Sequence, residues 1–245
     1  ALRIIESIEG TKGLPVFITE CDIDWGTGIS IYNNPNLHYR NSEYFAAFQC
    51  AMTKQMLDLR AEFPNNPIEA IFLDTFYIPG YRIFEGQRTL ITGEQHINKP
   101  ILNALRILGK LGKKQLAVTG KGDRSVEVLA TATENNSYLI MIVNFNEKLD
   151  YDRSVSISIR LEGLATGSWR CRHYRIDRDH SNAYTIWQSM GRPLVPDEQQ
   201  LLAVRKHQGL ELMEEFLVTS HDGIAYIETD MPPHSVSLFI LSRNQ

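Results

Sequence analysis

The sequence predicts an α/β part over residues 1–112 followed by an all-β part over residues 113–245. Two observations support this prediction. Before Gly112, apolar runs of strand length alternate with segments whose apolar residues recur at helical spacing. After Gly112, short segments in which apolar and polar residues alternate are separated by turns, a pattern typical of an antiparallel β-sandwich.

The first part opens with a helical pattern over residues 2–8, which Gly10 and Gly13 interrupt. The apolar run at residues 15–19 then predicts a strand, and this strand ends at Glu20 before a long polar and aromatic loop. In a barrel of alternating strands and helices, the loops that follow the strands build the active face. A carboxylate at a strand end is therefore a candidate catalytic group.

A long helix and a second strand follow this loop. Ser42 is a suitable N-cap, and apolar residues recur at helical spacing from there until Pro64. Residues 68–78 are apolar enough to predict a strand that is buried on both faces, as in parallel sheets. Another loop leads to a helix whose inward residues are Ile101, Leu102, Leu105, Leu108 and Leu111. The predicted order is therefore βαβα.

The second part predicts the strands of a sandwich. Residues 155–161 and 236–240 alternate and predict strands with one core face, whereas the continuously apolar residues 138–143 predict a central strand. Residues 197–207 suit a short helix laid against the sandwich. Three further strands are predicted at residues 126–132, 169–176 and 224–228.

Composition excludes several classes of protein. The 245 residues are 43% hydrophobic and 22% charged with a net charge of -4, so the lack of a basic excess argues against a nucleic-acid partner. No apolar run reaches membrane-spanning length, so no membrane partner is predicted. Cys21, Cys50 and Cys171 have no zinc-ligand spacing and predict free thiols, which slightly favours the cytoplasm and leaves localisation open.

Several motifs together resemble glycoside hydrolase family 39, which contains β-xylosidases and α-L-iduronidases. They cover nearly the whole chain. The motifs are Phe17-Ile18-Thr19-Glu20, Tyr44-Phe45-Ala46-Ala47, Asn98-Lys99-Pro100, Leu108-Gly109-Lys110-Leu111-Gly112, Tyr174-Arg175-Ile176-Asp177, His180-Ser181-Asn182-Ala183-Tyr184 and Met190-Gly191-Arg192-Pro193. The resemblance implies the last two βα units of a (β/α)8 TIM barrel (residues 1–112) and the accessory β-sandwich of the family (residues 113–245).

By this resemblance, Glu20 is the nucleophile of a retaining exo-glycosidase that works by double displacement without a metal or organic cofactor. Such a mechanism needs a second carboxyl group about 5 to 5.5 Å away as acid and base. In the family this is a glutamate preceded by asparagine, and the pair Asn146-Glu147 instead follows a predicted sandwich strand. We therefore expect the acid/base upstream of Ala1 and no turnover by this chain alone.

Five further residues are candidate sugar contacts. Trp25, His38 and Tyr39 lie in the loop after Glu20, where rings can stack on a sugar and an imidazole can bond a hydroxyl. Tyr77 follows the second strand, and Arg82 in the next loop is suited, as is Arg88, to clamp the carboxylate of a uronic acid. The alternative for each is a loop that packs on itself or a solvated side chain.

The strand before Tyr77 departs from the β-xylosidase pattern. The family has Trp-Thr-Phe-Ser-Asp there, and this chain reads Asp74-Thr75-Phe76-Tyr77-Ile78, so xylose specificity is open. Two other functions also stay open: a non-catalytic carbohydrate-binding protein and a structural or interaction module. We expect the rest of the barrel and a carbohydrate as partners, since two βα units leave apolar edges exposed, and association into a homo-oligomer is compatible with this.

Overall fold

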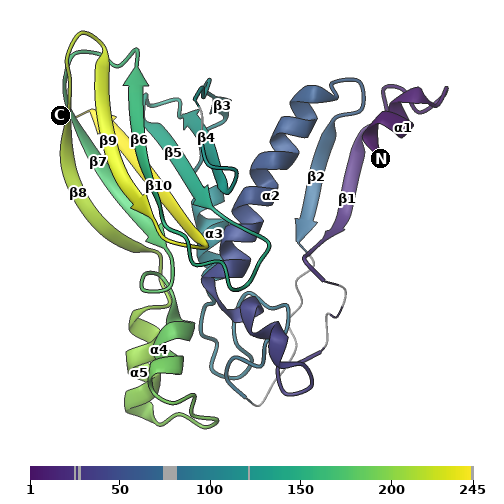
Figure 1. Cartoon of the computed structure of the whole chain (residues 1–245), viewed down its shortest axis with the longest axis vertical. Coiled ribbons are helices and arrows are strands. Elements are labelled where there is room, and N and C mark those ends of the chain that lie inside the picture. The colour runs from purple at the N-terminus through teal and green to yellow at the C-terminus, as the bar shows by residue number, and fades with distance from the viewer. Residues whose placement is uncertain (25, 27–28, 74–81, 121, 244–245) are drawn as a thin grey trace.

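The computed structural model describes residues 1–24, 26, 29–73, 82–120 and 122–243. Two parallel strands stand at one end of the molecule, two helices cross the middle, and antiparallel sheets form the other end (Figure 1). The elements of the first part are α1 (Leu2–Ser7), β1 (Val16–Cys21), η1 (Pro35–Asn41), α2 (Glu43–Glu62), β2 (Ile68–Leu73) and α3 (Pro100–Leu108).

The second part begins with β3, shortly after the end of α3. Its elements are β3 (Lys114–Gln115), β4 (Val126–Ala132), β5 (Tyr138–Asn144), β6 (Val155–Glu162), β7 (Gly167–Ile176), α4 (Ala183–Ser189), α5 (Glu198–Lys206), β8 (Glu211–Ser220), β9 (Ile224–Met231) and β10 (Ser235–Arg243). The helices and strands predicted from the sequence are present, except that residues 74–78 of the second predicted strand lie outside the described residues, and η1, β3, α4 and β8 were not predicted.

Local signals fix the ends of the long helices. The Ser42 hydroxyl accepts a hydrogen bond from the backbone of Tyr44 (3.3 Å), and α2 ends just before Pro64, which cannot continue a helix. Pro100 opens α3 at the position where its missing N–H costs nothing, and Gly109 follows its last residue. The two helices pack against each other and against the large sheet of the second part (Figure 1).

β1 and β2 form a parallel pair, as the βαβα order requires. One face of the pair points to the helices, where Leu73 packs against the core that contains α2. The prediction that the second strand is buried on both faces was wrong, because Phe72 is 52% exposed. Apolar composition shows that a strand can be buried, but burial itself depends on what covers each face.

The second part contains a six-stranded sheet in the order β3-β4-β5-β10-β7-β8 and a two-stranded sheet of β6 and β9. β5 is central and buried, as predicted, and β6 has the expected single buried face. The single core face predicted for residues 236–240 was wrong. β10 lies between β5 and β7 with both faces covered, so Ser237 and Phe239 are buried as well as Leu238.

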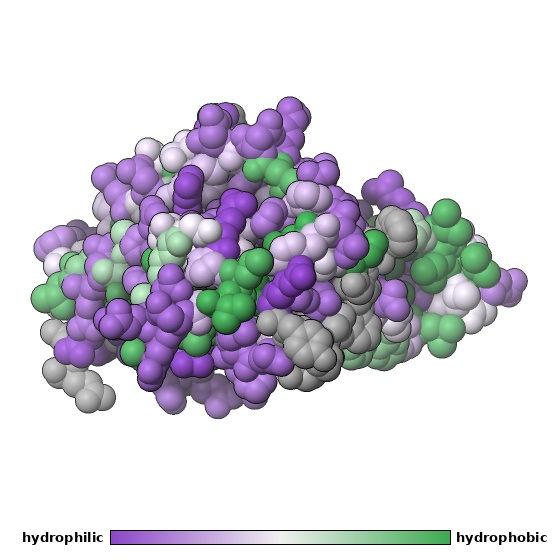
Figure 2. Space-filling model, turned by 90° about the horizontal axis from the view of Figure 1, so that it is seen from below, coloured by the Kyte–Doolittle hydropathy of each residue, from purple (hydrophilic) through white to green (hydrophobic). Residues whose placement is uncertain are grey.

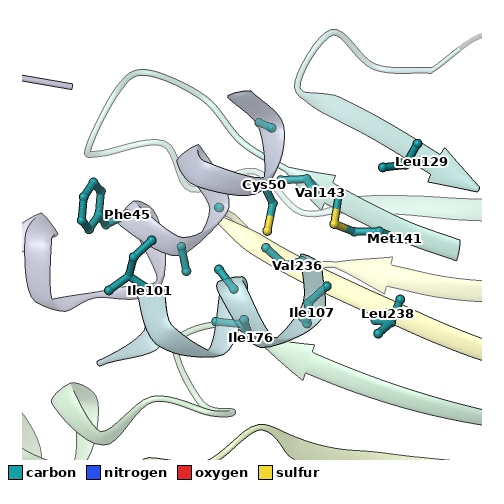
Figure 3. Packing of buried hydrophobic residues seen from close by; sticks show 14 of the residues in the cluster. Phe45, Cys50, Ile101, Ile107, Leu129, Met141, Val143, Ile176, Val236 and Leu238 are labelled. Carbon is teal, nitrogen blue, oxygen red and sulfur yellow. The ribbon is translucent and has the colours of Figure 1, made fainter. Parts of the chain in front are cut away.

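One hydrophobic core joins the two parts across Gly112. Phe45 and Cys50 of α2 and Ile101 and Ile107 of α3 lie against residues of the large sheet such as Val236 (Figure 3). A Cβ atom at Gly112 would lie 2.1 Å from the carbonyl oxygen of Ala132, so only glycine allows this close approach. The division into two domains at this residue stays a prediction, because the core draws side chains from both sides of it.

The other face of the six-stranded sheet packs on β6 and β9, which completes the sandwich. A third apolar cluster lies at the C-terminal ends of β1 and β2, where α4 and α5 meet the loop between β2 and α3. Phe84 of that loop packs there on Tyr184 and Trp187 of α4. The sandwich therefore contacts the loops that follow both parallel strands.

Candidate active site

A β-bulge determines where Glu20 points. Ile18 pairs with Ile71 and Cys21 pairs with Leu73, so β1 has two residues, Thr19 and Glu20, where β2 has one. Without the extra residue, Glu20 would follow Ile18 to the helix side of the pair, since side chains alternate along a strand. The bulge moves it to the opposite face, and both Thr19 and Glu20 are exposed.

No described element covers the face of the β1–β2 pair on which Glu20 lies. Phe17 is 57% exposed and Phe72 is 52% exposed on this face, although both are large apolar side chains. Ile4, Ile8 and Leu14 before β1 are also exposed, and hydrophobic residues gather at the end of the molecule that holds α1 and β1 (Figure 2). Such an apolar surface is typical of an interface rather than of solvent-facing protein.

Two carboxylates that follow Glu20 closely in the chain, Asp22 and Asp24, meet two buried guanidinium groups, those of Arg40 and Arg88. Asp22 and Arg88 form an ion pair at 3.0 Å between Oδ2 and Nε, and both side chains are 3% exposed. Arg88 also donates from Nη2 to Asp24 Oδ1 (3.2 Å), and Asp24 in turn pairs with Arg40. Two carboxylates and two guanidinium groups therefore join the loop after β1 to the loop after β2.

Arg40 is at the centre of this charge network. Its side chain is fully buried, and its Nε and Nη2 both face the carboxylate of Asp24. Nη1 donates to the carbonyl oxygens of Ile29 (3.2 Å) and Gly86 (3.3 Å). Because a guanidinium has a rigid planar set of donors, this one residue fixes three segments of the two loops.

Burial shifts the pKa values of two groups near this network. It raises the pKa of the Asp22 carboxyl to about 6, and the hydrogen bond from the backbone of Ile23 and the Arg88 charge only partly oppose this. Burial lowers the pKa of the Lys99 ammonium to about 7, and the positive charge of Arg40 acts in the same direction. Lys99 also occupies the N-cap position of α3, where the helix dipole disfavours a cation, and its side chain makes no capping hydrogen bond.

Lys99 makes stability depend on pH. Its folded pKa is below that of an exposed lysine, so between about pH 7 and 10 the unfolded chain binds more protons and stability rises with pH. We expect the unfolding free energy of the wild type, relative to Lys99→Met, to rise by about 1 kcal/mol per pH unit in this window. Urea titrations of both proteins at pH 7, 8 and 9 measure this difference in unfolding free energy. A difference that does not change with pH would contradict a lowered pKa of Lys99. The exposed Lys114→Met is the matched control.

The predicted sugar contacts fall into three groups. Trp25 and Tyr77 lie outside the described residues. His38 and Tyr39 make packing contacts: the imidazole of His38 hydrogen-bonds Tyr184, and the ring of Tyr39 packs edge-on against Tyr44 and Phe45. These contacts favour the alternative of a packed loop for Tyr39. His38 is half-buried, and its Nδ1 is the ring nitrogen that is hydrogen-bonded.

The two candidate arginines have different environments. Arg82 is exposed, and its guanidinium lies over the ring of Tyr32 at 4.4 Å from the centroid. Arg88 is buried in the charge network, so the expectation of a solvated loop arginine was wrong for it. Sequence reasoning missed the network itself, and the only available signal was the pair of acidic residues, Asp22 and Asp24, shortly after Glu20.

Among the residues that the structure describes, no second catalytic carboxylate near Glu20 is recognisable from the family pattern. Asn146 and Glu147 follow β5 in the sandwich, where the Glu147 carbonyl accepts a hydrogen bond from the Tyr44 hydroxyl (2.8 Å). Among the described residues, no group of histidine, cysteine, aspartate and glutamate is arranged to hold a metal ion. No helix in that part of the chain is long and apolar enough to cross a membrane.

Comparison with known proteins identifies the same fold over the whole chain. The family model for glycosyl hydrolases family 39 matches residues 1–211. No curated protein sequence matches the chain. Among solved structures, a bacterial orthologue of human α-L-iduronidase is 19% identical with a TM-score of 0.79, and the match covers 99% of this chain and 44% of that one.

Two other solved structures show the same relationship. A monomeric β-xylosidase from Caulobacter crescentus CB15 is 20% identical with a TM-score of 0.74, covering 100% of this chain and 48% of that one. A family 39 enzyme from Xanthomonas axonopodis pv. citri is 15% identical with a TM-score of 0.77, covering 99% and 47%. At these identities the likeness establishes the fold, which is a partial barrel followed by a β-sandwich. The chain spans about half the length of these structures.

Proposed function

Because the chain belongs to glycosyl hydrolases family 39, we propose that it is the C-terminal portion of a retaining exo-glycosidase, with Glu20 as the catalytic nucleophile. The observation that carries the proposal is the bulge at Thr19 and Glu20. It gives β1 an exposed carboxylate at its C-terminal end, on the face that the described helices leave uncovered. Active sites of barrel enzymes lie at this end of the strands.

The proposed chemistry needs one carboxylate from this chain. Glu20 attacks the anomeric carbon, the glycosidic bond breaks, and the leaving oxygen takes a proton from a second carboxylic acid. Water then attacks the anomeric carbon of this glycosyl ester with that second group as base, and the bond between the sugar and Glu20 breaks, which releases the sugar and restores the Glu20 carboxylate. The charge network of Asp22, Asp24, Arg40 and Arg88 supports this step by holding the loop directly after the nucleophile.

We propose that the second carboxylic acid comes from residues outside this chain. Two observations support this: the chain spans about half the length of the enzymes it resembles, and Phe17 and Phe72 expose an apolar face beside Glu20. The remaining strands of a barrel would cover such a face. An asparagine-glutamate pair after the fourth strand of the proposed barrel is the sequence that this proposal requires.

The substrate is proposed as a β-xyloside or an α-L-iduronide. The β-xyloside is proposed from the fold likeness to the β-xylosidase. The α-L-iduronide is proposed from the fold likeness to the α-L-iduronidase orthologue and from the cationic groups of the loop after β2. Of these, Arg82 is exposed and free to meet a ligand carboxylate at the cost of its contact with Tyr32. Trp25, His38, Tyr39 and Tyr77 stay proposed sugar contacts. No observation favours a non-catalytic binding protein or a structural module over the enzyme.

A mechanism-based label tests the nucleophile directly. An activated 2-deoxy-2-fluoro glycoside forms a slowly hydrolysed ester with the nucleophile of a retaining enzyme. We expect the longer protein to gain the mass of one fluorosugar on the peptide that contains Glu20. Both the xyloside and the iduronide reagent are used, because the reagent that reacts faster identifies the sugar.

Two results would overturn parts of the proposal. A label on a peptide without Glu20 would assign the nucleophile elsewhere. Steady hydrolysis of an aryl glycoside by residues 1–245 alone would show that the chain needs no second carboxylate from outside. In both experiments the matched control is Glu228→Gln, since Glu228 is also an exposed strand glutamate and lies on β9 of the sandwich.

A further inference from the structure

A side chain of the sandwich reaches the loop that follows Glu20. The hydroxyl of Tyr184, in the first turn of α4, hydrogen-bonds Nδ1 of His38 in η1. The two ring centroids are 6.1 Å apart. η1 and α4 both lie at the end of the molecule where β1 and β2 have their C-terminal ends (Figure 1). The contact therefore joins the sandwich to the face where the proposed active site opens.

The position of Tyr184 is fixed by its surroundings. Its ring is 2% exposed and packs edge-on against Phe84 (5.2 Å between centroids) and stacks on Trp187 (5.6 Å). The turn before it is also anchored, because Asn182 donates to the Glu43 carboxylate (2.8 Å) and accepts from the backbone of Thr185 (3.3 Å). A rigid hydroxyl of this kind can orient the imidazole that it contacts.

His38 is only partly enclosed by this contact. Its Nδ1 faces the Tyr184 hydroxyl, and no hydrogen bond to Nε2 is present among the described residues. Burial, with a smaller contribution from the charge of Arg192, lowers the pKa of His38, so the ring is neutral at pH 7. Burial raises the pKa of Tyr184 to about 12, so the phenol keeps its proton.

The direction of the hydrogen bond follows from these protonation states. A phenol is a stronger acid than a neutral imidazole N–H, and an imidazole nitrogen is a stronger base than a phenol oxygen. The favoured arrangement is therefore O–H donating to an unprotonated Nδ1, which leaves the proton of the ring on Nε2. A partner on one ring nitrogen sets the tautomer in the same way at metal sites.

We propose that Tyr184 is a positioning residue, which holds His38 in the Nε2–H tautomer so that the imidazole presents one fixed donor to an oxygen of the substrate. The ligand class is a hydroxyl or carboxylate oxygen of a pyranose ring. This inference rests on the proposed glycosidase function for the identity of the ligand. It assigns the accessory sandwich a part in substrate binding through Tyr184.

The tautomer is measured on the chain itself. Nitrogen-15 spectra of histidine-labelled protein at pH 8 distinguish the protonated from the unprotonated ring nitrogen of His38. We expect Nε2–H to predominate in the wild type, and the ratio of Nε2–H to Nδ1–H to fall about fivefold in Tyr184→Phe. This variant keeps the ring and removes the hydrogen bond to His38 together with the interactions of the hydroxyl with Asn41 and Gln188. Nδ1–H as the major wild-type form, or an unchanged ratio in the variant, would overturn the proposal.

Tyr44→Phe is the matched control for this measurement. Tyr44 is also a nearly buried tyrosine whose hydroxyl donates to the sandwich, at the Glu147 carbonyl, and its hydrogen bond and ring contacts among the described residues do not involve His38. We expect the His38 tautomer ratio in Tyr44→Phe to stay within about twofold of the wild-type ratio. The protein with Tyr44→Phe should lose about as much unfolding free energy as the protein with Tyr184→Phe. A control that shifts the ratio as strongly as Tyr184→Phe would show a general loosening and contradict a specific role.

The substrate part of the inference is tested in the longer enzyme. Tyr184→Phe is expected to raise KM about fivefold and to change kcat less than twofold, since it weakens binding away from the reacting atoms. His38→Ala is expected to raise KM by at least as much, and the double variant by no more than His38→Ala alone. Additive effects, or an unchanged KM in either single variant, would overturn the substrate role. The tautomer measurement stands even if no glycosidase activity is found.

Discussion

Glu20→Gln, in the longer glycosidase that we propose, should lower kcat for glycoside hydrolysis by at least about a thousandfold, which is the largest change we expect from any single substitution. The amide has nearly the shape of the carboxylate, but it is neutral and cannot form the glycosyl ester. Steady-state kinetics with an aryl glycoside measures the loss. The kcat of the control variant Glu228→Gln should stay within twofold of the wild-type kcat.

Stability separates a catalytic role of Glu20 from a structural one. The side chain of Glu20 is exposed and makes no hydrogen bond among the described residues, so Glu20→Gln should change the melting temperature by no more than about 2 °C. A variant that keeps more than a tenth of the wild-type kcat would remove Glu20 from the nucleophile role. A variant that loses activity together with several degrees of melting temperature would point instead to a structural carboxylate.

Arg40→Met has the largest expected effect on folding. It removes the fully buried guanidinium that faces Asp24 and leaves the carbonyls of Ile29 and Gly86 without their donor. Breaking a buried ion pair from one side costs about 3 to 5 kcal/mol, and we expect the low end of this range because Asp24 is 25% exposed and keeps its contact with Arg88. Urea denaturation of residues 1–245 measures the loss.

Two further variants test the cause of that loss. Arg160→Met removes an exposed arginine paired with Glu162 at 2.9 Å and should cost less than about 1 kcal/mol. Adding Asp24→Leu to Arg40→Met should restore part of the stability, since the carboxylate that has lost one of its two guanidinium partners is then removed while Arg88 keeps its ion pair with Asp22. Equal losses in the two arginine variants, or a double variant less stable than Arg40→Met, would contradict the assigned role of the charge network.

Elements with strong local signals were predicted correctly. α2 has an N-cap serine, a regular apolar spacing and a terminal proline, and α5 has the capping box of Asp197 and Gln200. β8 was missed because Leu212 and Met213 are consecutive and both exposed, which breaks the alternation of a strand. The register explains this: Tyr174 pairs with Leu212 and His173 with Glu214, so Met213 is an extra, unpaired residue on an edge strand.

The candidate site was predictable only in part. The glutamate at the strand end and the family resemblance were visible in the sequence, and the fold and family agree with them. The bulge that turns Glu20 to the uncovered face was not visible, because it depends on the pairing of β1 with β2 rather than on either strand alone. The roles proposed for Glu20, Trp25, His38, Tyr39, Tyr77 and Arg82 await experiments.

The sequence by itself determined the order of helices and strands, the change from α/β to antiparallel pattern near Gly112 and the family, because periodicity, caps and short motifs are local properties. Only the tertiary structure decided which charges meet. Asp22 and Arg88 are far apart in the chain, as are His38 and Tyr184, and nothing in a linear pattern selects one partner among many. Their pairing, and the pKa shifts that follow, depend on how two loops and the sandwich exclude water together.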